Sequence, residues 1–341
     1  MAASIDDVID KFSLNDVFAL PQDASARRYY RAIRNGKNVI IMLYPDADDG
    51  NKAELIRFLD YGSRLDAHAI RVAQCYEADI ENGYALLEDL GEKSFGALLR
   101  SGKKNHNDLY DMATRTLLKM TAIKDLNNLP EYKKTQIYKN RRQFVDYYMA
   151  YKKGEPADEE CAQEFLNLWD EIEAKLPPSP HGFVHGDYHL ENMMYLEHEV
   201  PDFRSALIDY QDAFYGPVPY DLLNLLEDAR ADVPQQIRKK MIKLYTAGMS
   251  ENARNDFMMW YKVLAAQFHC RVIGLFLKLT AQRQSEVYLQ HIPRLQHYLA
   301  TSYQDPLLEP FHKWLEKVGL DFNPIKALDK KSISTFFSRA K

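Results

Sequence analysis

Glycine is scarce in this chain of 341 residues, which contains 14 glycines against 22 tyrosines. The scarcity matters because loops that cradle phosphate groups are usually glycine-rich, which lets the backbone approach the ligand closely. The P-loop pattern GxxxxGK followed by Ser or Thr occurs nowhere in the sequence. The chain therefore has no ordinary P-loop, and any phosphate group that it binds must be held by other residues.

Cysteine and positive charge are also in short supply. The three cysteines, Cys75, Cys161 and Cys270, are far apart and odd in number, which argues against a disulfide framework and favours a reducing, cytoplasmic location. Lysine and arginine number 44 against 49 aspartates and glutamates, which gives a formal net charge of −5. Because nucleic-acid binding needs a basic face that displaces counterions, a nucleic-acid partner is not expected.

Long apolar runs are missing as well. No run approaches the roughly 18 uncharged apolar residues that a membrane helix needs, so no membrane association is expected. The opening MAASIDDVID is acidic and lacks the basic and apolar regions of a secretory signal. The share of hydrophobic residues, 46%, is that of a folded soluble protein, which excludes a disordered chain.

The first third of the chain has the pattern of two hairpins and two helices. β-prone runs flank Asn35-Gly36 and again Asn82-Gly83, and Asn-Gly between such runs indicates a hairpin because both turn positions need positive φ. Apolar residues at helical spacing predict helices over 4–12, with Ser4 as the N-cap, and over roughly 52–65. We expect a small antiparallel sheet with a helix packed on it.

After residue 94 the pattern becomes mainly helical, with one strand-and-loop segment over 181–221. At roughly 150 residues per domain the length corresponds to about two units. We therefore predict an α+β fold with a small antiparallel-sheet N-lobe, residues 1–90, and a larger, mainly helical C-lobe, residues 91–341. The segments with helical spacing are 94–101, 107–126, 136–153, 158–176, 256–280 and 291–303.

The segment 181–221 gathers the polar residues that carry chemistry. It reads HGFVHGDYHLENMMYL from His181, with Asp187 and Asn192 five apart, and Asp209 ends a β-prone run seventeen residues later. Phosphoryl transfer needs a carboxylate that positions and deprotonates the attacking hydroxyl, and a carboxamide and a second carboxylate as oxygen ligands of Mg²⁺. The order and spacing of these residues therefore predict a phosphotransferase.

The pattern His-Gly-Asp-x-x-x-x-Asn followed by Ile-Asp resembles the catalytic loop and metal-binding Asp of the protein-kinase-like fold, in its aminoglycoside phosphotransferase-like branch. The resemblance implies a two-lobed enzyme that uses ATP and Mg²⁺, with nucleotide bound by the N-lobe. It assigns Asp187 as the catalytic base and Asn192 and Asp209 as magnesium ligands.

Four further stretches are similar to the bacterial anomeric amino-sugar kinases: DASARRYYR, LLEDLG, IDYQDAFYGPVPYDLLNLLEDAR and QFHCRVIGLFLKL. Members of that subgroup phosphorylate N-acetylmuramate or N-acetylglucosamine at the anomeric hydroxyl in cell-wall recycling. The resemblance implies such a sugar as acceptor. An aminoglycoside, a choline-like alcohol or another hydroxyl compound is the alternative within the same enzyme class.

The resemblance also implies a hinge at residues 86–90, where the backbones of Glu88 and Leu90 would bind adenine. Kinase-like folds usually place a phosphate-binding lysine on the strand after the first hairpin turn, but the strand over 39–43 reads VIIML and contains none. Lys37 lies at the turn, about five residues early, where we expect it to face solvent.

Other groups must therefore hold the phosphates. Ser25 and its backbone are one candidate, and Arg28 or Arg31 is the other, since a guanidinium matches phosphate oxygens. The two arginines are three apart, so on a strand they face opposite sides and only one is expected to reach the site. The alternative for either is a solvated surface arginine.

Five more polar residues could bind substrate or support the loop. His185 is expected to order the loop, and His189 either to do the same or to face substrate. Asp212 has the same two alternatives. Asp221 precedes a helix and reads as an N-cap, and the resemblance also makes it a brace of the catalytic loop. Arg271 stands in an apolar helix and needs a partner, either an internal carboxylate or a carboxylate-bearing sugar such as N-acetylmuramate.

Two other classes of function remain open. His181, His185 and His189 are spaced by four, so on a helix they would form a zinc-like site of a metal-dependent hydrolase, although Gly182 and Gly186 make that helix doubtful. The missing strand lysine would also fit a non-catalytic, nucleotide-binding pseudokinase.

Overall fold

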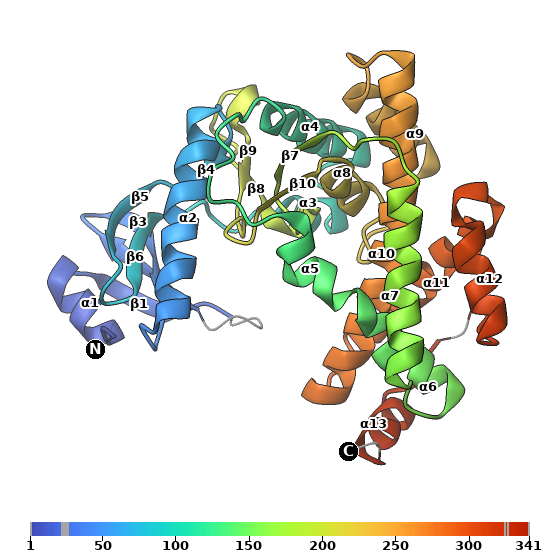
Figure 1. Ribbon diagram of the computed structural model, residues 1–341. Coiled ribbons are helices and arrows are strands. Elements are labelled where there is room, and N and C mark those ends of the chain that lie inside the picture. Colours follow the sequence, from blue (N-terminus) through green and yellow to red (C-terminus); the bar gives the residue numbers. More distant parts are fainter. Residues whose placement is uncertain (1, 22–26, 324, 326, 340–341) are drawn as a thin grey trace. The chain divides into compact units, whose positions relative to one another are not determined.

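The computed structural model describes residues 2–21, 27–323, 325 and 327–339, and the chain divides into two compact units (Figure 1). The first unit comprises Met1–Asn127 and Asp187–Ala213, and the second comprises Asn128–Gly186 and Phe214–Lys341. The boundary of the lobes predicted from the sequence, at residue 90, lies within the first unit. Those lobes, residues 1–90 and 91–341, remain a proposal about the division of nucleotide and substrate binding.

A five-stranded antiparallel sheet forms the N-terminal part of the first unit, in the order β1-β2-β3-β6-β5. The predicted hairpin turn at Asn35-Gly36 is confirmed, because it joins β2 to β3 and both residues have positive φ. At the second predicted hairpin only Gly83 has positive φ. The strands are β1 (Asn15–Ala19), β2 (Arg28–Arg34), β3 (Lys37–Leu43), β5 (Cys75–Asp79) and β6 (Tyr84–Glu88).

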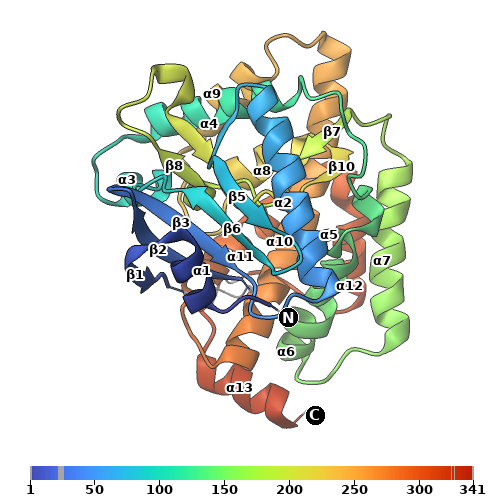
Figure 2. The same cartoon turned by 90° about the vertical axis from the view of Figure 1, so that its left-hand side faces the viewer.

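The two faces of this sheet have different roles. One face packs on helix α1 (Ile5–Phe12), which begins at the predicted cap Ser4 with a reciprocal capping box from Asp7. The opposite face, together with helix α2 (Asp49–Ala67), lines a cavity. Figure 2 shows α1 and α2 beside the strands. The α1 face buries Ala32, Val39, Ile41, Leu43 and Leu86.

A second, three-stranded sheet in the first unit has the order β4-β9-β8. Its strands are β4 (Arg71–Val72), β8 (Met193–Tyr195) and β9 (Ser205–Leu207), and helices α3 (Phe95–Arg100) and α4 (His106–Met120) contact it. Parallel pairing of β4 with β9 joins residues near position 71 to residues near position 206. This pairing is why the segment 187–213 belongs to the first unit.

The second unit is mainly helical and is built on the long helix α10 (Glu251–Arg283). A two-stranded sheet of β7 (His181–Val184) and β10 (Phe214–Pro217) completes the unit. Its other helices are α5 (Gln136–Lys139), α6 (Ala150–Lys153), α7 (Glu159–Ala174), α8 (Pro219–Leu226), α9 (Gln235–Tyr245), α11 (Ile292–Thr301), α12 (Glu309–Lys317) and α13 (Lys330–Arg339).

The predicted single helix over 136–153 is wrong. The segment consists of α5, a 3₁₀ helix at Asn140–Arg142, a π-helix at Phe144–Met149 and α6. The reason is the close approach of α10, where Gly274 lies against the backbone of Gln143 and Phe144. Apolar spacing along one segment cannot reveal this distant contact.

Helix α10 is an exception to the expectation that no run is apolar enough for a membrane. Among the described helices it alone is long and apolar enough to cross one, judged by length and composition. Of its most apolar 18-residue window, 78% is buried inside the protein, which is the behaviour of a core helix.

Candidate active site

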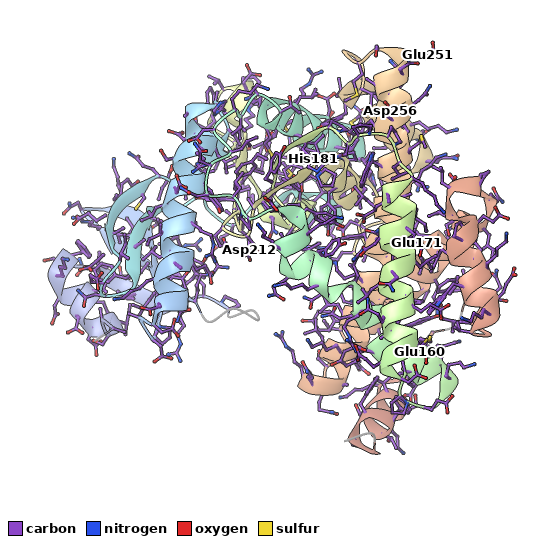
Figure 3. The ribbon with its side chains drawn as sticks, in the orientation of Figure 1. Glu160, Glu171, His181, Asp212, Glu251 and Asp256 are labelled. Carbon is purple, nitrogen blue, oxygen red and sulfur yellow. The ribbon has the colours of Figure 1, made fainter. Side chains whose placement is uncertain are left out.

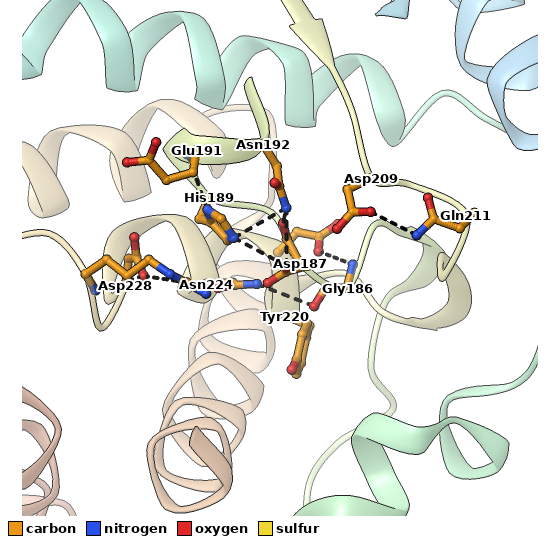
Figure 4. Close-up of polar contacts among 12 residues, drawn as sticks. Gly186, Asp187, His189, Glu191, Asn192, Asp209, Gln211, Tyr220, Asn224 and Asp228 are labelled. Carbon is orange, nitrogen blue, oxygen red and sulfur yellow. Dashed lines mark hydrogen bonds and ion pairs between the residues drawn. The ribbon is translucent and has the colours of Figure 1, made fainter. Parts of the chain in front are cut away.

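Asp187, the predicted base, lies on the loop that precedes β8, and its side chain is 53% exposed. Nδ2 of Asn192 donates to the carbonyl oxygen of Asp187 at 2.9 Å and to its Oδ2 at 3.2 Å, as Figure 4 shows. Because the nitrogen of this amide is directed at Asp187, the oxygen Oδ1 of Asn192 is directed away from it. The loop thus presents a carboxylate and an amide oxygen with different orientations.

His189 is part of the same network and is 4% exposed. Its Nδ1 accepts the backbone N–H of Glu191 at 3.3 Å, and its Nε2 lies 3.3 Å from Oδ2 of Asp187 (Figure 4). The same Nε2 also lies 3.3 Å from Nδ2 of Asn192, so the ring contacts both other polar residues of the loop. These contacts favour an ordering role in the loop for His189.

The loop is anchored to helices α3 and α4. The buried Tyr188 donates its hydroxyl to the carbonyl of Ala113 at 2.8 Å. Glu191 accepts from Ser94 Oγ at 3.0 Å and from Arg100, and these hydrogen bonds lower the pKa of Glu191 although burial opposes the shift. The ionised Glu191 therefore holds the loop against the start of α3. The sequence analysis did not identify this role.

In the second unit, Asp221 holds the two residues that come directly before Asp187 in the chain. Its carboxylate accepts the N–H of His185 at 2.7 Å and of Gly186 at 2.9 Å, and it is 2% exposed. The N-cap prediction for Asp221 is wrong, because Val218 caps α8 and Asp221 lies inside it. Asn224, which the sequence analysis missed, donates Nδ2 to the Gly186 carbonyl at 3.4 Å.

Asp209 follows β9 and lies on the wall of the cavity. Its φ is +62°, a conformation that is uncommon for residues other than glycine and that occurs often at functional sites. Its Oδ1 accepts from Arg27 Nη2 at 2.9 Å and from Gln211 Nε2 at 3.0 Å. The strained backbone and the two donors fix the direction of this carboxylate.

Arg27 is a residue of this site that the sequence analysis missed. Its side chain is 7% exposed, and its Nε lies 3.2 Å from Oε1 of Glu54 on α2. Burial lowers the pKa of this guanidinium, but the oxygens of Tyr29, Asp209 and Glu54 raise it by more, so the group stays charged. The position next to the predicted Arg28 and the β-prone YYR that follows were the available signals.

The cavity has a volume of about 680 Å³, and all of its lining residues belong to the first unit. One end is apolar, with Ile40, Leu87 and Leu90. The other end is polar, with Asn192 and Asp209. A cavity that is apolar at one end and polar at the other can take a ligand with a flat ring at one end and charged groups at the other.

The predicted hinge residues lie at the apolar end. The N–H of Glu88 is bonded to the carbonyl of Gln74 at 2.8 Å, and its carboxylate to Arg71. Leu90 is buried, and no described residue accepts a hydrogen bond from its N–H. At this end the N–H of Leu90 is therefore available to a ligand, whereas that of Glu88 is not.

The predicted phosphate-binding residues differ in position. Arg31 lines the cavity, but its guanidinium is engaged with Asp89 at 2.6 Å and with Glu92 beside the hinge. Arg28 begins β2 with its side chain exposed, and Lys37 is exposed as expected. Ser25 lies outside the described residues.

Two of the remaining candidates are placed as follows. Asp212, which is labelled in Figure 3, is exposed and lines the same cavity as Asp209. Arg271 lies on α10 of the second unit, and no carboxylate of the described residues forms an ion pair with it. Its Nη2 donates to the hydroxyl of Tyr220 at 3.0 Å. Its Nε is buried, and no described atom accepts from it. The expected internal salt bridge is therefore not found among the described residues.

The zinc-site alternative loses its geometric basis. His181 opens the strand β7 (Figure 3), so the three histidines do not share one face of a helix. Within the described ranges no group of three or more His, Cys, Asp or Glu side chains could hold a metal ion.

Comparison with known protein families identifies the family of this chain. A model described as the phosphotransferase enzyme family, APH, matches residues 16–254. The chain belongs to this family. The predicted resemblance is thereby confirmed, and the protein is a phosphotransferase that acts on a hydroxyl acceptor.

Curated relatives of this phosphotransferase carry one name, N-acetylmuramate/N-acetylglucosamine kinase. The protein of Neisseria meningitidis serogroup B is 28% identical over 290 residues, which cover 81% of this chain and 82% of the relative. The one from Pseudomonas aeruginosa is 27% identical, covering 82% and 81%. The one from Caulobacter vibrioides is 28% identical, covering 88% and 91%.

Solved structures confirm the protein-kinase-like α+β fold. ADP-bound aminoglycoside phosphotransferase APH(2'')-Ib has a TM-score of 0.57 and 13% identity, covering 87% of this chain and 96% of its own. Plasmodium vivax ethanolamine kinase has a TM-score of 0.55 and 12% identity, covering 84% and 82%. At these identities the likeness establishes the fold of the phosphotransferase.

Proposed function

We propose that this phosphotransferase is an ATP- and Mg²⁺-dependent kinase that phosphorylates the anomeric hydroxyl of N-acetylmuramate or N-acetylglucosamine. The observation that carries the proposal is the grouping of Asp187, Asn192 and Asp209 in one compact unit, with the last two on the wall of the cavity. The acceptor is supported by relatives of that name, which match 81–88% of the chain.

In the proposed reaction Asp187 orients the sugar hydroxyl and takes its proton. The hydroxyl oxygen forms a bond to the γ-phosphorus while the bond from that phosphorus to the bridging oxygen of ADP breaks, so the released electron pair stays on ADP. Positioning and electrostatic stabilisation supply most of the rate in such transfers. The hydrogen bond from Asn192 and the contact with Nε2 of His189 hold the carboxylate of Asp187 for this task.

The residues on the cavity wall fit a magnesium ion. Mg²⁺ prefers hard oxygen ligands and usually takes only one or two carboxylates from the protein. Oδ1 of Asn192 and the carboxylate of Asp209 are such oxygens, and the +62° φ of Asp209 fixes its direction. When bound, the ion would neutralise charge on the phosphates, and these two side chains would hold it.

The hinge supports the placement of adenine at the apolar end of the cavity. Leu87 and Leu90 offer apolar surface there, and the N–H of Leu90 is the proposed donor to the ring. Because the N–H of Glu88 is bonded to Gln74, only the carbonyl of Glu88 is proposed as the second adenine partner. The cytoplasmic location that three free cysteines favour agrees with the supply of ATP there.

The test is turnover on a panel of acceptors. The purified chain is incubated with ATP, Mg²⁺ and, separately, N-acetylmuramate, N-acetylglucosamine, an aminoglycoside, choline and ethanolamine, and ADP release is followed. We expect release with the two amino sugars and a new anomeric phosphate by phosphorus NMR. Release with the aminoglycoside or the amino alcohols alone would assign another acceptor.

A second candidate is a pseudokinase that binds nucleotide without turnover. The observation in its favour is the apolar cavity side of β3, where Ile40 lines the cavity and Met42 contacts Tyr29, so no lysine is present on that strand face. ATP binding by calorimetry together with no ADP release on any acceptor would favour it over the kinase.

A further inference from the structure

Every second residue lines the cavity along β2 and at Arg27, the residue directly before this strand. Arg27, Tyr29 and Arg31 line the cavity, whereas Tyr30 packs on the opposite, α1 side of the sheet. This alternation is the ordinary consequence of the two-residue period of a strand. It places Arg27 and Arg31, rather than Arg28, on the side of the cavity.

The two arginines have different partners. Nη2 of Arg31 donates to Asp89 and to the carbonyl of Gly91, and its Nε lies 2.6 Å from Oδ2 of Asp89, all next to the hinge. Its guanidinium is therefore used to fix the apolar end of the cavity. Among the described lining residues, Arg27 is the other cation, and it lies at the polar end against Asp209.

Helix α2 supplies the second partner of Arg27. Glu54 lines the cavity and contacts Nε of the guanidinium at 3.2 Å, while Asp209 contacts Nη2 at 2.9 Å. The two carboxylates therefore bind different nitrogens of one fork. If Asp209 also binds a metal ion, Glu54 can still hold Arg27 in place, because it contacts a different nitrogen of the guanidinium.

We propose that Arg27 binds the phosphates of the nucleotide and that Glu54 positions it, so that this pair replaces the strand lysine that β3 lacks. The inference rests on the proposed kinase function and adds to it the cation of the phosphate site. A buried guanidinium is suited to this role, since it presents a planar set of donors that matches phosphate oxygens and stays charged at every physiological pH.

The charges around Arg27 give the proposal a further consequence. Two carboxylates surround one guanidinium, so this end of the cavity carries net negative charge. A polyphosphate is repelled by such a site until a divalent cation compensates the carboxylates. Nucleotide binding through Arg27 is therefore expected to depend on Mg²⁺ for ATP and not for adenosine.

The experiment compares dissociation constants of ATP with Mg²⁺ and of adenosine for the full chain and its variants, by calorimetry or fluorescence competition. In Arg27→Gln we expect the ATP constant to rise at least about tenfold, because charged hydrogen bonds are lost, with the adenosine constant unchanged within about twofold. The ATP constant of Arg27→Lys should lie between those of wild type and Arg27→Gln. Glu54→Gln should weaken ATP binding less than Arg27→Gln does.

The matched control is Arg34→Gln, which removes an ion-paired arginine of β2, the partner of Glu77, and should leave both constants unchanged. Equal weakening of ATP and adenosine in Arg27→Gln would make Arg27 a purely structural residue and overturn the proposal. The proposal is also overturned if Arg28→Gln, and not Arg27→Gln, weakens the binding of ATP without weakening that of adenosine. If Arg27→Gln does not fold, the ratio of the dissociation constants of ATP and adenosine in Arg27→Lys decides.

Failure of this inference differs from failure of the proposed function. If wild type turns over an amino sugar but the ratio of the two constants does not change in the Arg27 variants, only the inference is wrong. If wild type binds no ATP with Mg²⁺, the proposed function fails and the inference fails with it.

Discussion

Asp187 carries its carboxylate on a loop in which each neighbouring polar group has a defined partner. Asn192 and His189 contact its Oδ2, and Tyr188 and Glu191 fasten the loop to α4 and α3. A substitution that keeps the size of the side chain can therefore remove the base without disturbing the loop.

We accordingly predict that Asp187→Asn lowers kcat by about 100-fold or more, the range in which positioned base catalysis contributes. The dissociation constant of ATP should stay within about twofold, because Asp187 acts on the acceptor. Steady-state kinetics with N-acetylmuramate and calorimetry with ATP measure the two effects. Asp202→Asn, an exposed carboxylate of the same unit, is the control. Loss of less than tenfold in kcat would refute the assignment of the base.

Arg271 gives a prediction about the choice of acceptor. Its buried Nε has no acceptor among the described atoms, and a buried donor without a hydrogen-bond partner is costly. If the lactyl carboxylate of N-acetylmuramate is that anion, Arg271→Gln should raise KM for N-acetylmuramate at least about tenfold and leave KM for N-acetylglucosamine, which lacks the carboxylate, almost unchanged. Equal changes in both KM values would show that Arg271 does not bind this carboxylate.

At the scale of single residues, the residues of the motif could be predicted from the sequence, but their distant partners could not. Asp187 and Asn192 stand five apart in one loop, so their relation is visible in the sequence. Arg27 and Asp209 are separated by 182 positions, and only the fold brings them within 2.9 Å. An ion pair between residues so far apart in the chain leaves no local pattern. Of the two predicted arginines, Arg31 lines the cavity and Arg28 is exposed, whereas Arg27 was not predicted.

At the scale of the elements, the contact of α10 with the π-helix Phe144–Met149 depends on one glycine. A Cβ on Gly274 would overlap the carbonyl of Gln143 and lie 2.7 Å from the nitrogen of Phe144. These are backbone atoms, so the clash cannot be relieved by rotating a side chain. The hydrophobic periodicity of 136–153 predicted one regular helix because this requirement lies on α10, more than a hundred residues away.

We predict that Gly274→Ala destabilises the protein by about 2 kcal/mol or more, although alanine is by about 1 kcal/mol the better helix former. Urea unfolding followed by circular dichroism measures the difference. Gly248→Ala is the control, since a Cβ there has no described atom within 4 Å. A Gly274→Ala variant as stable as wild type would show that the two elements can separate at little cost.

At the scale of the whole molecule, family membership and fold class followed from the sequence, whereas the division into units did not. The segment 187–213 packs with the N-terminal part of the chain through the parallel register of Arg71 with Ala206 and of Val72 with Leu207. Parallel pairing between strands so far apart requires a long crossover, which local periodicity does not report. The hairpins could be predicted because their paired strands are neighbours in sequence.

The buried histidine of the second unit links its stability to pH. His269 is 2% exposed, is stacked on Tyr298 at 4.6 Å, and lies 3.5 Å from the carboxylate of Glu227. Burial lowers the pKa of His269 to about 3, and the charge of Arg238 adds to this, while a hydrogen bond to the backbone of Glu227 opposes it. Burial also raises the pKa of Glu227, so both shifts favour the uncharged forms of the pair.

Because the folded pKa of His269 lies below the unfolded value of 6.5, the unfolded chain binds a proton that the folded chain does not bind at acid pH. The contribution of His269 to stability is present above pH 6.5 and is lost as the pH falls toward 3. Between pH 7 and pH 5 this loss amounts to about 2 kcal/mol. The raised pKa of Glu227 acts in the opposite direction, since its stabilisation is present at low pH and is lost as the pH rises.

We therefore predict that the free energy of unfolding falls by about 2 kcal/mol less between pH 7 and pH 5 in His269→Gln than in wild type. Glu227 is retained in both proteins, so its opposite contribution largely cancels in the comparison. Urea unfolding at the two pH values measures the difference, and His181→Gln, which removes an exposed histidine, should keep the wild-type dependence. If His269→Gln loses as much stability as wild type does, His269 is protonated inside the folded unit, and the pair with Glu227 must then be ionic, with the proton held between the buried ring and the carboxylate.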